Sequence, residues 1–400
     1  LLALVLPLYL DQALLVTGLA VMAAAVGAIG LNLLSGSTGQ LSLAHAFFIA
    51  IGTYGYAYFS GAPGGLATPY GGLELPPLLG AAMAVVLAGL AGLAFSPISG
   101  RLSGIYLGVA SLSLVIIGQH LLFNWDSVTG GPNGRAVPAF SLFGFEFANT
   151  QPDGTQLFVL NVPFRRNELL WYLFLAVLVL GFLFARNLMR GRSGRALQMI
   201  RDKQTAAAVM GVNVARYKSL AFVVSSMYAG AAGVLLAQVL RNPTPGSFGL
   251  TLSITYLAMI VIGGLGSVAG SVVGATFVAA TPLLLSRYAD LLPFLSRPGS
   301  GGVDSGTLAK FLYGGAVVLV LLLEPGGVAA IGRRLLARIT GSAQEQRQRA
   351  QAATEDGGAD EESVDTSGSP AANAATGTAD TSVQGPDRGA DPSTEGNQRP

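Results

Sequence analysis

The sequence contains no cysteine, two histidines and few charged residues. Without cysteine the chain can form no disulfide, thiolate nucleophile or cysteine-ligated metal site. Charged residues make up 11% of the chain, against roughly a quarter in an average soluble protein. His45 and His120 lie too far apart in the sequence to indicate a metal site. These shortages argue against a soluble globular enzyme.

Apolar residues and glycine are abundant instead. The chain is 51% apolar, has a mean hydropathy of +0.56, and contains 54 glycines in 400 residues. A membrane-spanning helix needs about 20 mostly apolar residues, and small residues allow such helices to pack closely. We therefore predict an all-α integral membrane protein, a polytopic bundle of about nine or ten transmembrane helices, some short or broken.

The predicted spans are 13–34, 41–60, 75–96, 102–123, 169–185, 219–240, two short helices within 251–285, and 308–323. The two short helices are expected because a glycine-rich break at 263–266 divides a run too long for one helix. Leu1–Leu10 is apolar but short, and we expect it to be the end of a further helix.

Basic residues predict the orientation of these spans. Residues 186–218 carry eight lysines and arginines against one acidic residue, Asp202, which is typical of a short cytoplasmic loop. Counting spans from this loop puts Arg101 and the arginines at 333–338 on the same side, and residues 124–168 outside. We expect a multi-pass protein of the inner or plasma membrane with a cytoplasmic C-terminus.

The charge distribution also predicts the domain organisation. Residues 341–400 carry 11 of the 21 acidic residues but 4 of the 23 basic ones, and almost no large apolar residue. Such a segment buries too little surface to offset its chain entropy. We predict a transmembrane domain at 1–340, which includes a cytoplasmic loop at 186–218, and a disordered acidic tail at 341–400.

Motifs for chemistry are missing from the sequence. It has no phosphate-binding loop, no zinc-protease motif and no serine-hydrolase elbow. No predicted span has an Asp or Glu well inside it, although ion-coupled carriers usually need one. We expect neither an enzyme nor a bound cofactor or metal, and any energy source would belong to another protein.

The predicted cytoplasmic loop contains a short helix signal. Asp202 is a preferred N-cap residue and Gly211 a preferred C′ residue, which predicts a two-turn helix with Ala207 and Met210 on one face. A helix this short needs a partner. Its apolar knob, ringed by basic side chains, suits a groove on a soluble protein, while an interfacial helix on anionic headgroups is the alternative. The basic side chains are Arg195, Arg201 and Lys203.

This segment resembles the cytoplasmic EAA loop of ABC importer permeases, in the variant of branched-chain amino-acid permeases, close to IRDNE-x-AA-x-x-MG-[IV]-N. The matching residues are Ile200, Arg201, Asp202, Ala206, Ala207, Met210, Gly211, Val212 and Asn213. The chain departs at Lys203 and Gln204, where the family commonly has Asn and Glu. The resemblance implies that this loop docks an ATPase, although Gln204 does not carry the charge with which the family's Glu would meet that partner.

Three further segments are similar to that family's motifs, in the family's order. They are Gly30–Ala46, Ala258–Ser267 and Leu323–Val328. Membership implies a permease subunit without its own ATPase activity, importing branched-chain amino acids. It also implies that the domain at 1–340 is the transmembrane permease domain and that 186–218 is its cytoplasmic coupling loop. The implied partners are cytoplasmic ABC ATPase subunits, a second permease in a heterodimer, and an extracytoplasmic substrate-binding protein in addition to the lipid bilayer. No nucleic acid is expected.

A polar stretch between the first two spans is a candidate for the translocation path or its gate, because free backbone groups are tolerated at membrane depth only beside a cavity or water. The alternative is an ordinary cytoplasmic turn. The candidate residues are Asn32, Ser35, Ser37, Thr38, Gln40 and Ser42.

Gly266, Gly270 and Gly274 form a double G-x-x-x-G pattern. This pattern predicts close helix packing, either within the subunit or between subunits. The residues leave two other functions open. One is a related ABC permease for urea, amides or another small polar solute, and the other is an ATPase-independent channel or ion-coupled carrier.

Overall fold

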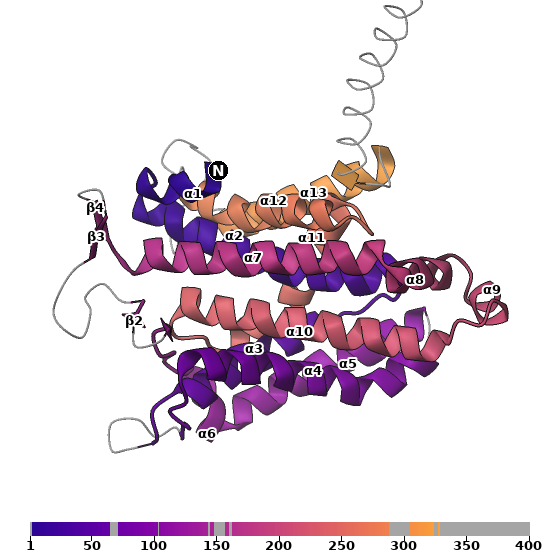
Figure 1. Ribbon diagram of the computed structural model, residues 1–400, viewed down its shortest axis with the longest axis horizontal. Coiled ribbons are helices and arrows are strands. Elements are labelled where there is room, and N and C mark those ends of the chain that lie inside the picture. Colours follow the sequence, from indigo (N-terminus) through magenta and orange to yellow (C-terminus); the bar gives the residue numbers. More distant parts are fainter. Residues whose placement is uncertain are drawn as a thin grey trace, which may run out of the picture. The chain divides into compact units, whose positions relative to one another are not determined.

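The computed structural model describes residues 2–64, 71–102, 104–142, 145–147, 157–159, 162–287, 305–323 and 327–328. Within them, each of the nine apolar stretches predicted from the sequence corresponds to a helix (Figure 1). These helices are α2 (Gln12–Leu31), α3 (His45–Ser60), α4 (Pro77–Arg101), α5 (Ile105–Asn124), α7 (Arg166–Arg190), α10 (Val214–Leu240), α11 (Leu250–Gly263), α12 (Val268–Arg287) and α13 (Ser305–Leu323). The all-helical prediction is confirmed. The predicted tail and the arginines at 333–338 lie outside the described residues.

Shorter elements complete the described part of the chain. The helical ones are α1 (Leu2–Val5), α6 (Asp126–Thr129), α8 (Arg192–Asp202), α9 (Gln204–Val209), and the 3₁₀ turns Leu6–Leu8, Gly131–Asn133 and Pro245–Phe248. Asn32–Gly36, which directly follows α2, is a π-helical turn, called the π turn below. Two antiparallel hairpins lie between α5 and α7: β1 (Ser141–Leu142) with β2 (Phe145–Glu146), and β3 (Leu157–Val159) with β4 (Val162–Phe164).

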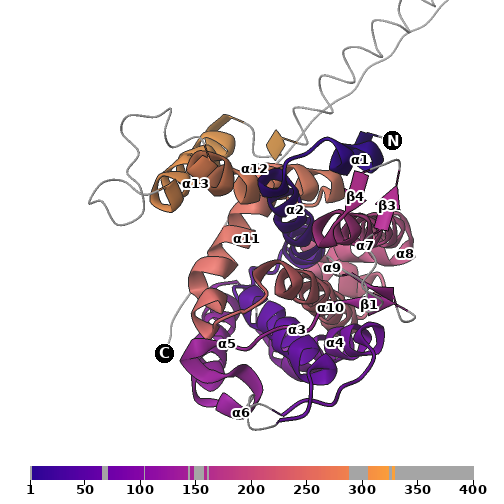
Figure 2. The same cartoon turned by 90° about the vertical axis from the view of Figure 1, so that its left-hand side faces the viewer.

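Six helices in the described part are long and apolar enough to cross a membrane: α2 with the π turn, α4, α5, α7, α10 and α12. In α2 and α10, 67% of the 18-residue apolar segment is buried inside the protein, whereas the buried share is 28% in each of the other four helices. The apolar side chains that α4, α5, α7 and α12 leave exposed have the character of a lipid-facing surface. Accordingly, α2 and α10 form the centre of the bundle (Figure 2).

Helix α10 contacts α2, α3 and α4, and small residues permit this close packing. A Cβ atom at Gly52 of α3 would lie 2.2 Å from the Gly230 carbonyl oxygen of α10. A Cβ at Gly230 would in turn lie 2.6 Å from the Cβ of Ala88 on α4. The glycine excess of the sequence is therefore used, at this crossing, to bring backbones into contact.

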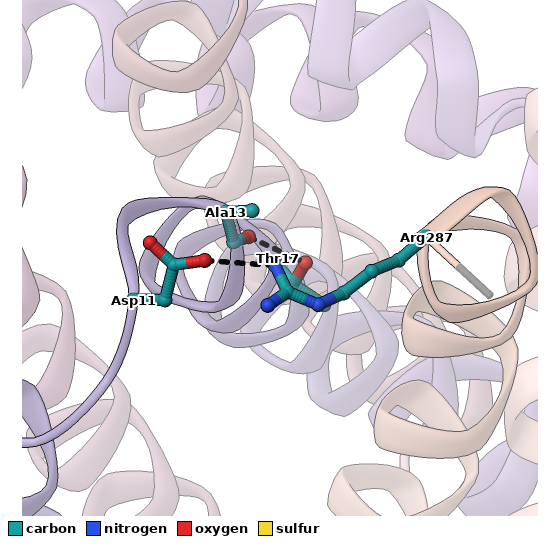
Figure 3. Close-up of polar contacts among 4 residues, drawn as sticks. All are labelled: Asp11, Ala13, Thr17 and Arg287. Carbon is teal, nitrogen blue, oxygen red and sulfur yellow. Dashed lines mark hydrogen bonds and ion pairs between the residues drawn. The ribbon is translucent and has the colours of Figure 1, made fainter.

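Helix α12 runs antiparallel to α2 and contacts α2, α11 and α13. At one end of the pair, the Arg287 guanidinium of α12 donates to the Asp11 carboxylate at 2.9 Å (Figure 3). In the next turn of α2, the Thr17 hydroxyl donates to the Ala13 carbonyl at 2.8 Å. The hydrogen bond from Arg287 is the main cause that lowers the pKa of Asp11 below its usual value.

Candidate functional site

The loop between α7 and α10 contains α8 and α9, which together form one end of the bundle, called the loop end below (Figure 1). The predicted N-cap is wrong. The Lys203 amide donates to the Met199 carbonyl at 3.0 Å, so α8 continues through Asp202. Lys203 is extended and occupies the N-cap position of α9. Gly211 does end the helix: its φ is +81°, the left-handed conformation that favours glycine.

The predicted face shared by Ala207 and Met210 is also wrong. Ala207 is fully buried, whereas the exposed fractions of Val209 and Met210 are 88% and 76%. The reason is tertiary packing, since α9 contacts α8 and α10 and so has an inner side. The exposed apolar knob consists of Val209 and Met210, immediately before the turn at Gly211.

Other residues of the loop are packed or hydrogen-bonded within the chain. Ile200 of α8 is fully buried. The Asn213 side chain accepts a hydrogen bond from the Arg216 amide at 3.1 Å and thereby caps α10. The buried Lys218 ammonium donates to Oε1 of Gln204 at 3.0 Å, so a residue that departs from the family motif makes a contact within the chain. The remaining predicted loop residues Arg195, Asp202, Ala206 and Gly211 are exposed.

Arg201 reaches from α8 to the end of the π turn rather than ringing the knob. Its Nη1 atom donates to the Gly36 carbonyl oxygen at 2.6 Å. A Cβ atom placed on Gly266 would lie 3.0 Å from the same Nη1 atom. Arg201 thus joins the loop to two turns of the bundle, one after α2 and one between α11 and α12.

Asn32 connects those two turns. Its Oδ1 atom accepts from the Gly266 amide at 2.7 Å. Its Nδ2 atom donates to the Ser267 carbonyl at 2.9 Å, to the Ser271 hydroxyl at 2.6 Å and to the Gly264 carbonyl at 3.3 Å. This buried amide uses its donor and acceptor within the chain. We call Asn32, the π turn and residues 264–267 the hub.

The other candidate path residues are also buried and mostly bonded within the chain. The Ser37 and Thr38 hydroxyls donate to the carbonyls of Leu33 and Leu34, one turn earlier. Gln40 exchanges hydrogen bonds with Ser99 of α4 at 3.1 and 3.2 Å.

Two candidate path residues remain. The Ser42 hydroxyl accepts from the Ala44 amide at 3.4 Å. The Ser35 hydroxyl is buried and has no hydrogen-bond partner among the described residues, which makes it the one member of this set whose side chain is not bonded there.

Sequence reasoning missed a set of buried serines that hold the polar stretch in place. The Ser111 hydroxyl accepts from the Leu43 amide at 2.9 Å, and the Ser253 hydroxyl accepts from the Ala46 amide at 3.0 Å. Ser99 and Ser271 bind Gln40 and Asn32, as described above. Their signal in the sequence is a lone small hydroxyl within an apolar stretch, a residue type that joins helices inside membranes.

The three packing glycines do not act alike. Gly266 lies in the turn before α12, with a φ of +84°, so it is not part of a helical G-x-x-x-G pattern. Gly270 and Gly274 lie on α12 against α11. A Cβ atom at Gly274 would lie 1.9 Å from the Met259 carbonyl oxygen, and one at Gly263 would lie 2.1 Å from the Gly270 carbonyl oxygen. The close approach at these two glycines is between helices of one chain.

The nine apolar helices and the buried polar hub define a polytopic helical membrane protein. The family model described as "Branched-chain amino acid transport system / permease component" matches residues 14–321. The chain therefore belongs to the permease family of branched-chain amino-acid ABC transporters, whose members are not themselves enzymes.

Two of three individual relatives have names that agree with this assignment, and the third is a permease for a sugar. The chain is 32% identical over 322 residues to the high-affinity branched-chain amino acid transport system permease protein LivM of Escherichia coli, covering 79% of this chain and 69% of that protein. It is 27% identical over 302 residues to the permease protein LivH of the same system and organism, covering 75% and 89%. The xylose transport system permease protein XylH of Haemophilus influenzae is 29% identical over 224 residues, or 49% of this chain and 55% of that protein. No solved structure matches the chain.

Proposed function

We propose that this chain is a permease subunit of an ATP-driven importer that moves branched-chain amino acids across the cell membrane. The observation that carries the proposal is the exposed Val209–Met210 knob, which lies at the loop end of a chain of the branched-chain amino-acid permease family. ATP hydrolysis would occur on separate cytoplasmic ATPase subunits. A second, different permease and an extracytoplasmic binding protein would complete the transporter.

The shape of α9 supports docking of a soluble ATPase. Ala207 anchors the inner side of the helix, and Val209 and Met210 project from it. The helix ends in a Schellman-type turn, in which the Gly211 amide donates to Ala208 and the Val212 amide donates to the Ala207 carbonyl, both at 3.0 Å. The turn fixes the direction of the knob. With eight basic residues against one acid at 186–218, this end faces the cytoplasm in the proposed orientation.

The decisive experiment is a mild-detergent pull-down of the tagged chain from its own host, with the partners identified by mass spectrometry. We expect to recover a nucleotide-binding ATPase and a second permease. Recovery of the chain alone across several detergents would contradict the proposal and favour an ATPase-independent channel or carrier. Leucine uptake with urea and xylose as competitors would separate the proposed substrate from other small polar solutes.

Two variants, Met210→Glu and Gly211→Pro, test whether α9 is the docking element, and Gln198→Glu is the control. Met210→Glu places a carboxylate on the knob and should reduce ATPase recovery at least tenfold, because a buried unpaired charge is costly at an interface. Gln198→Glu, on the exposed side of α8, carries the same added charge and should leave recovery unchanged. Gly211→Pro should also uncouple uptake, because proline cannot adopt a φ of +81°. Normal uptake in that variant would refute the coupling role of this helix.

A further inference from the structure

Three segments that are distant in the sequence meet at Gly36. A Cβ atom on Gly36 would lie 1.9 Å from the Asn32 Oδ1 atom and 2.4 Å from the Gly266 amide nitrogen. The Gly36 carbonyl accepts the 2.6 Å hydrogen bond from Arg201. Gly36, the last residue of the π turn, therefore lies against Arg201 of the loop, Asn32 of its own turn and the turn before α12.

The chemistry at this point suits a guanidinium. The last carbonyls of a helix have no partner in the helix itself and carry partial negative charge. Gly36 ends the helical path that begins at Gln12, so its carbonyl is such an acceptor. The Arg201 stem also passes the next glycine, since a Cβ on Gly39 would lie 3.6 Å from Arg201 Cγ.

On the loop side, Arg201 is held by a helix that is itself anchored. Leu197 and Ile200 of α8 are buried, so α8 cannot rotate freely about its axis. The extended residue Lys203 links α8 directly to α9. A displacement of α9 therefore acts on the end of α8, where Arg201 is located, as well as on α10 through the bond between Gln204 and Lys218.

On the bundle side, Arg201 is bonded to the last residue of the π turn. A π turn holds one residue more than the α-helical path requires, and such turns are often found at functional sites. Asn32 in this turn is bonded to residues 264, 266, 267 and 271. A change in the π turn is consequently shared with the start of α12.

We propose that Arg201 is a positioning residue that transmits movement of the α8–α9 loop to the hub, and so links ATPase movement to the transmembrane helices. This inference rests on the proposed function. Arg201 acts through the Gly36 carbonyl and is not itself a contact with the ATPase. Removal of its side chain should leave docking intact and separate ATP hydrolysis from transport.

The test uses the full chain with the proteins that copurify with it, reconstituted in liposomes, with leucine as the transported probe. We expect Arg201→Ala to retain ATPase recovery within twofold of wild type but to lower the amount of leucine moved per ATP hydrolysed at least tenfold. Arg201→Lys keeps one donor for the carbonyl and should recover part of this ratio. Arg192→Ala removes an exposed arginine at the start of the same helix and should leave both quantities unchanged.

Two results with Arg201→Ala would overturn the inference. One is a ratio of leucine to ATP within twofold of wild type, and the other is failure to recover the ATPase, which would assign Arg201 to the docking surface. If wild type itself recovers no ATPase, the proposed function fails. If wild type recovers the ATPase and Arg201→Ala transports normally, the inference alone fails.

A second measurement avoids altering Arg201. Because the chain has no cysteine, Gln198→Cys on α8 and Leu265→Cys in the hub, both exposed, can carry spin labels at two defined positions. The hydrogen bond between Arg201 and Gly36 predicts the same distance between the two labels with and without ATP, because α8 and the hub would move together. A change as large as one helical turn, about 5 Å, would show that they move independently and would contradict the proposal.

Discussion

Replacement of Asn32 by alanine is the most direct test of the hub. Two of the hydrogen bonds of Asn32, to Gly264 and to the Ser271 hydroxyl, are buried, and two, with Gly266 and Ser267, are partly buried. Water can replace the partly buried bonds more easily than the buried ones. With about 1 kcal/mol for each buried bond and less for the others, the expected decrease in stability is about 2–3 kcal/mol.

The assay is thermal unfolding in detergent, followed through the intrinsic fluorescence of Trp125 and Trp171. The unfolding entropy is about 2.1 cal/mol/K per residue, so for roughly 300 folded residues 1 kcal/mol corresponds to a shift of about 1–2 °C, and we expect Asn32→Ala to lower the midpoint by about 2–6 °C. Unfolding of membrane proteins is often irreversible, so variants are compared at one heating rate. Asn187→Ala, at an exposed position near the end of α7, is the control and should not shift the midpoint.

Asn32→Asp separates hydrogen bonding from side-chain size. Aspartate keeps the acceptor for the Gly266 amide but places a carboxylate oxygen against the carbonyls of Gly264 and Ser267. It should therefore destabilise at least as much as alanine. An Asn32→Asp protein as stable as wild type would refute the hydrogen-bond assignment. In the Asn32→Ala background, Ser271→Ala should cost less than it does alone, because the two side chains share one bond.

Three further predictions concern packing and charge. Gly274→Ala should destabilise by several kcal/mol because no space exists for its Cβ 1.9 Å from a backbone oxygen, whereas Gly314→Ala on α13 meets nothing within 4 Å and should be neutral or slightly stabilising in the same melting assay. Gln204→Glu should form an ion pair with Lys218 and raise the midpoint by an amount equivalent to about 0.5–1 kcal/mol; a lower midpoint would contradict this geometry. At pH values above 3.8, the ordinary carboxyl pKa, Asp11→Asn should lower the melting midpoint slightly, because the arginine partner depresses the pKa of Asp11 in the folded protein. The difference between variant and wild type should begin to shrink below pH 3.8, disappear as the pH falls through the depressed pKa, and also shrink in high salt. A difference that grows on acidification would refute the sign.

The sequence predicted the helices well and their contacts poorly. Each long apolar stretch is a helix, because length and hydropathy are local properties of the chain. The turn at Gly211 was also predictable, because the local backbone there requires a glycine.

The side-chain assignments of the loop needed tertiary information. Arg201 looked like part of a basic ring around an exposed helix, yet it donates to a carbonyl 165 positions earlier in the chain. Ala207 and Met210 lie three residues apart, which predicts a shared face for an isolated helix, but the partner helices bury one and leave the other exposed. The residue pattern within 194–213 predicts neither the partner of Arg201 nor the different exposure of Ala207 and Met210.

The polar stretch after α2 shows the same limit. Its composition fits a translocation path and a structural turn equally well. Asn32, Ser37, Thr38, Gln40 and Ser42 make hydrogen bonds within the chain, which favours a structural turn. A role beside the path stays a prediction for this stretch, and unchanged uptake in Asn32→Ala and Gln40→Ala would exclude it.

The pairing of α2 with α12 has a mechanical consequence. The two antiparallel helices are joined at one end by Asp11 and Arg287 and at the other by the Asn32 bonds. Sliding one helix along the other by a single turn, about 5.4 Å, would break the connections at both ends together. The pair should therefore behave as one rigid strut, so that any change of shape in the bundle moves α2 and α12 as a unit against their neighbours.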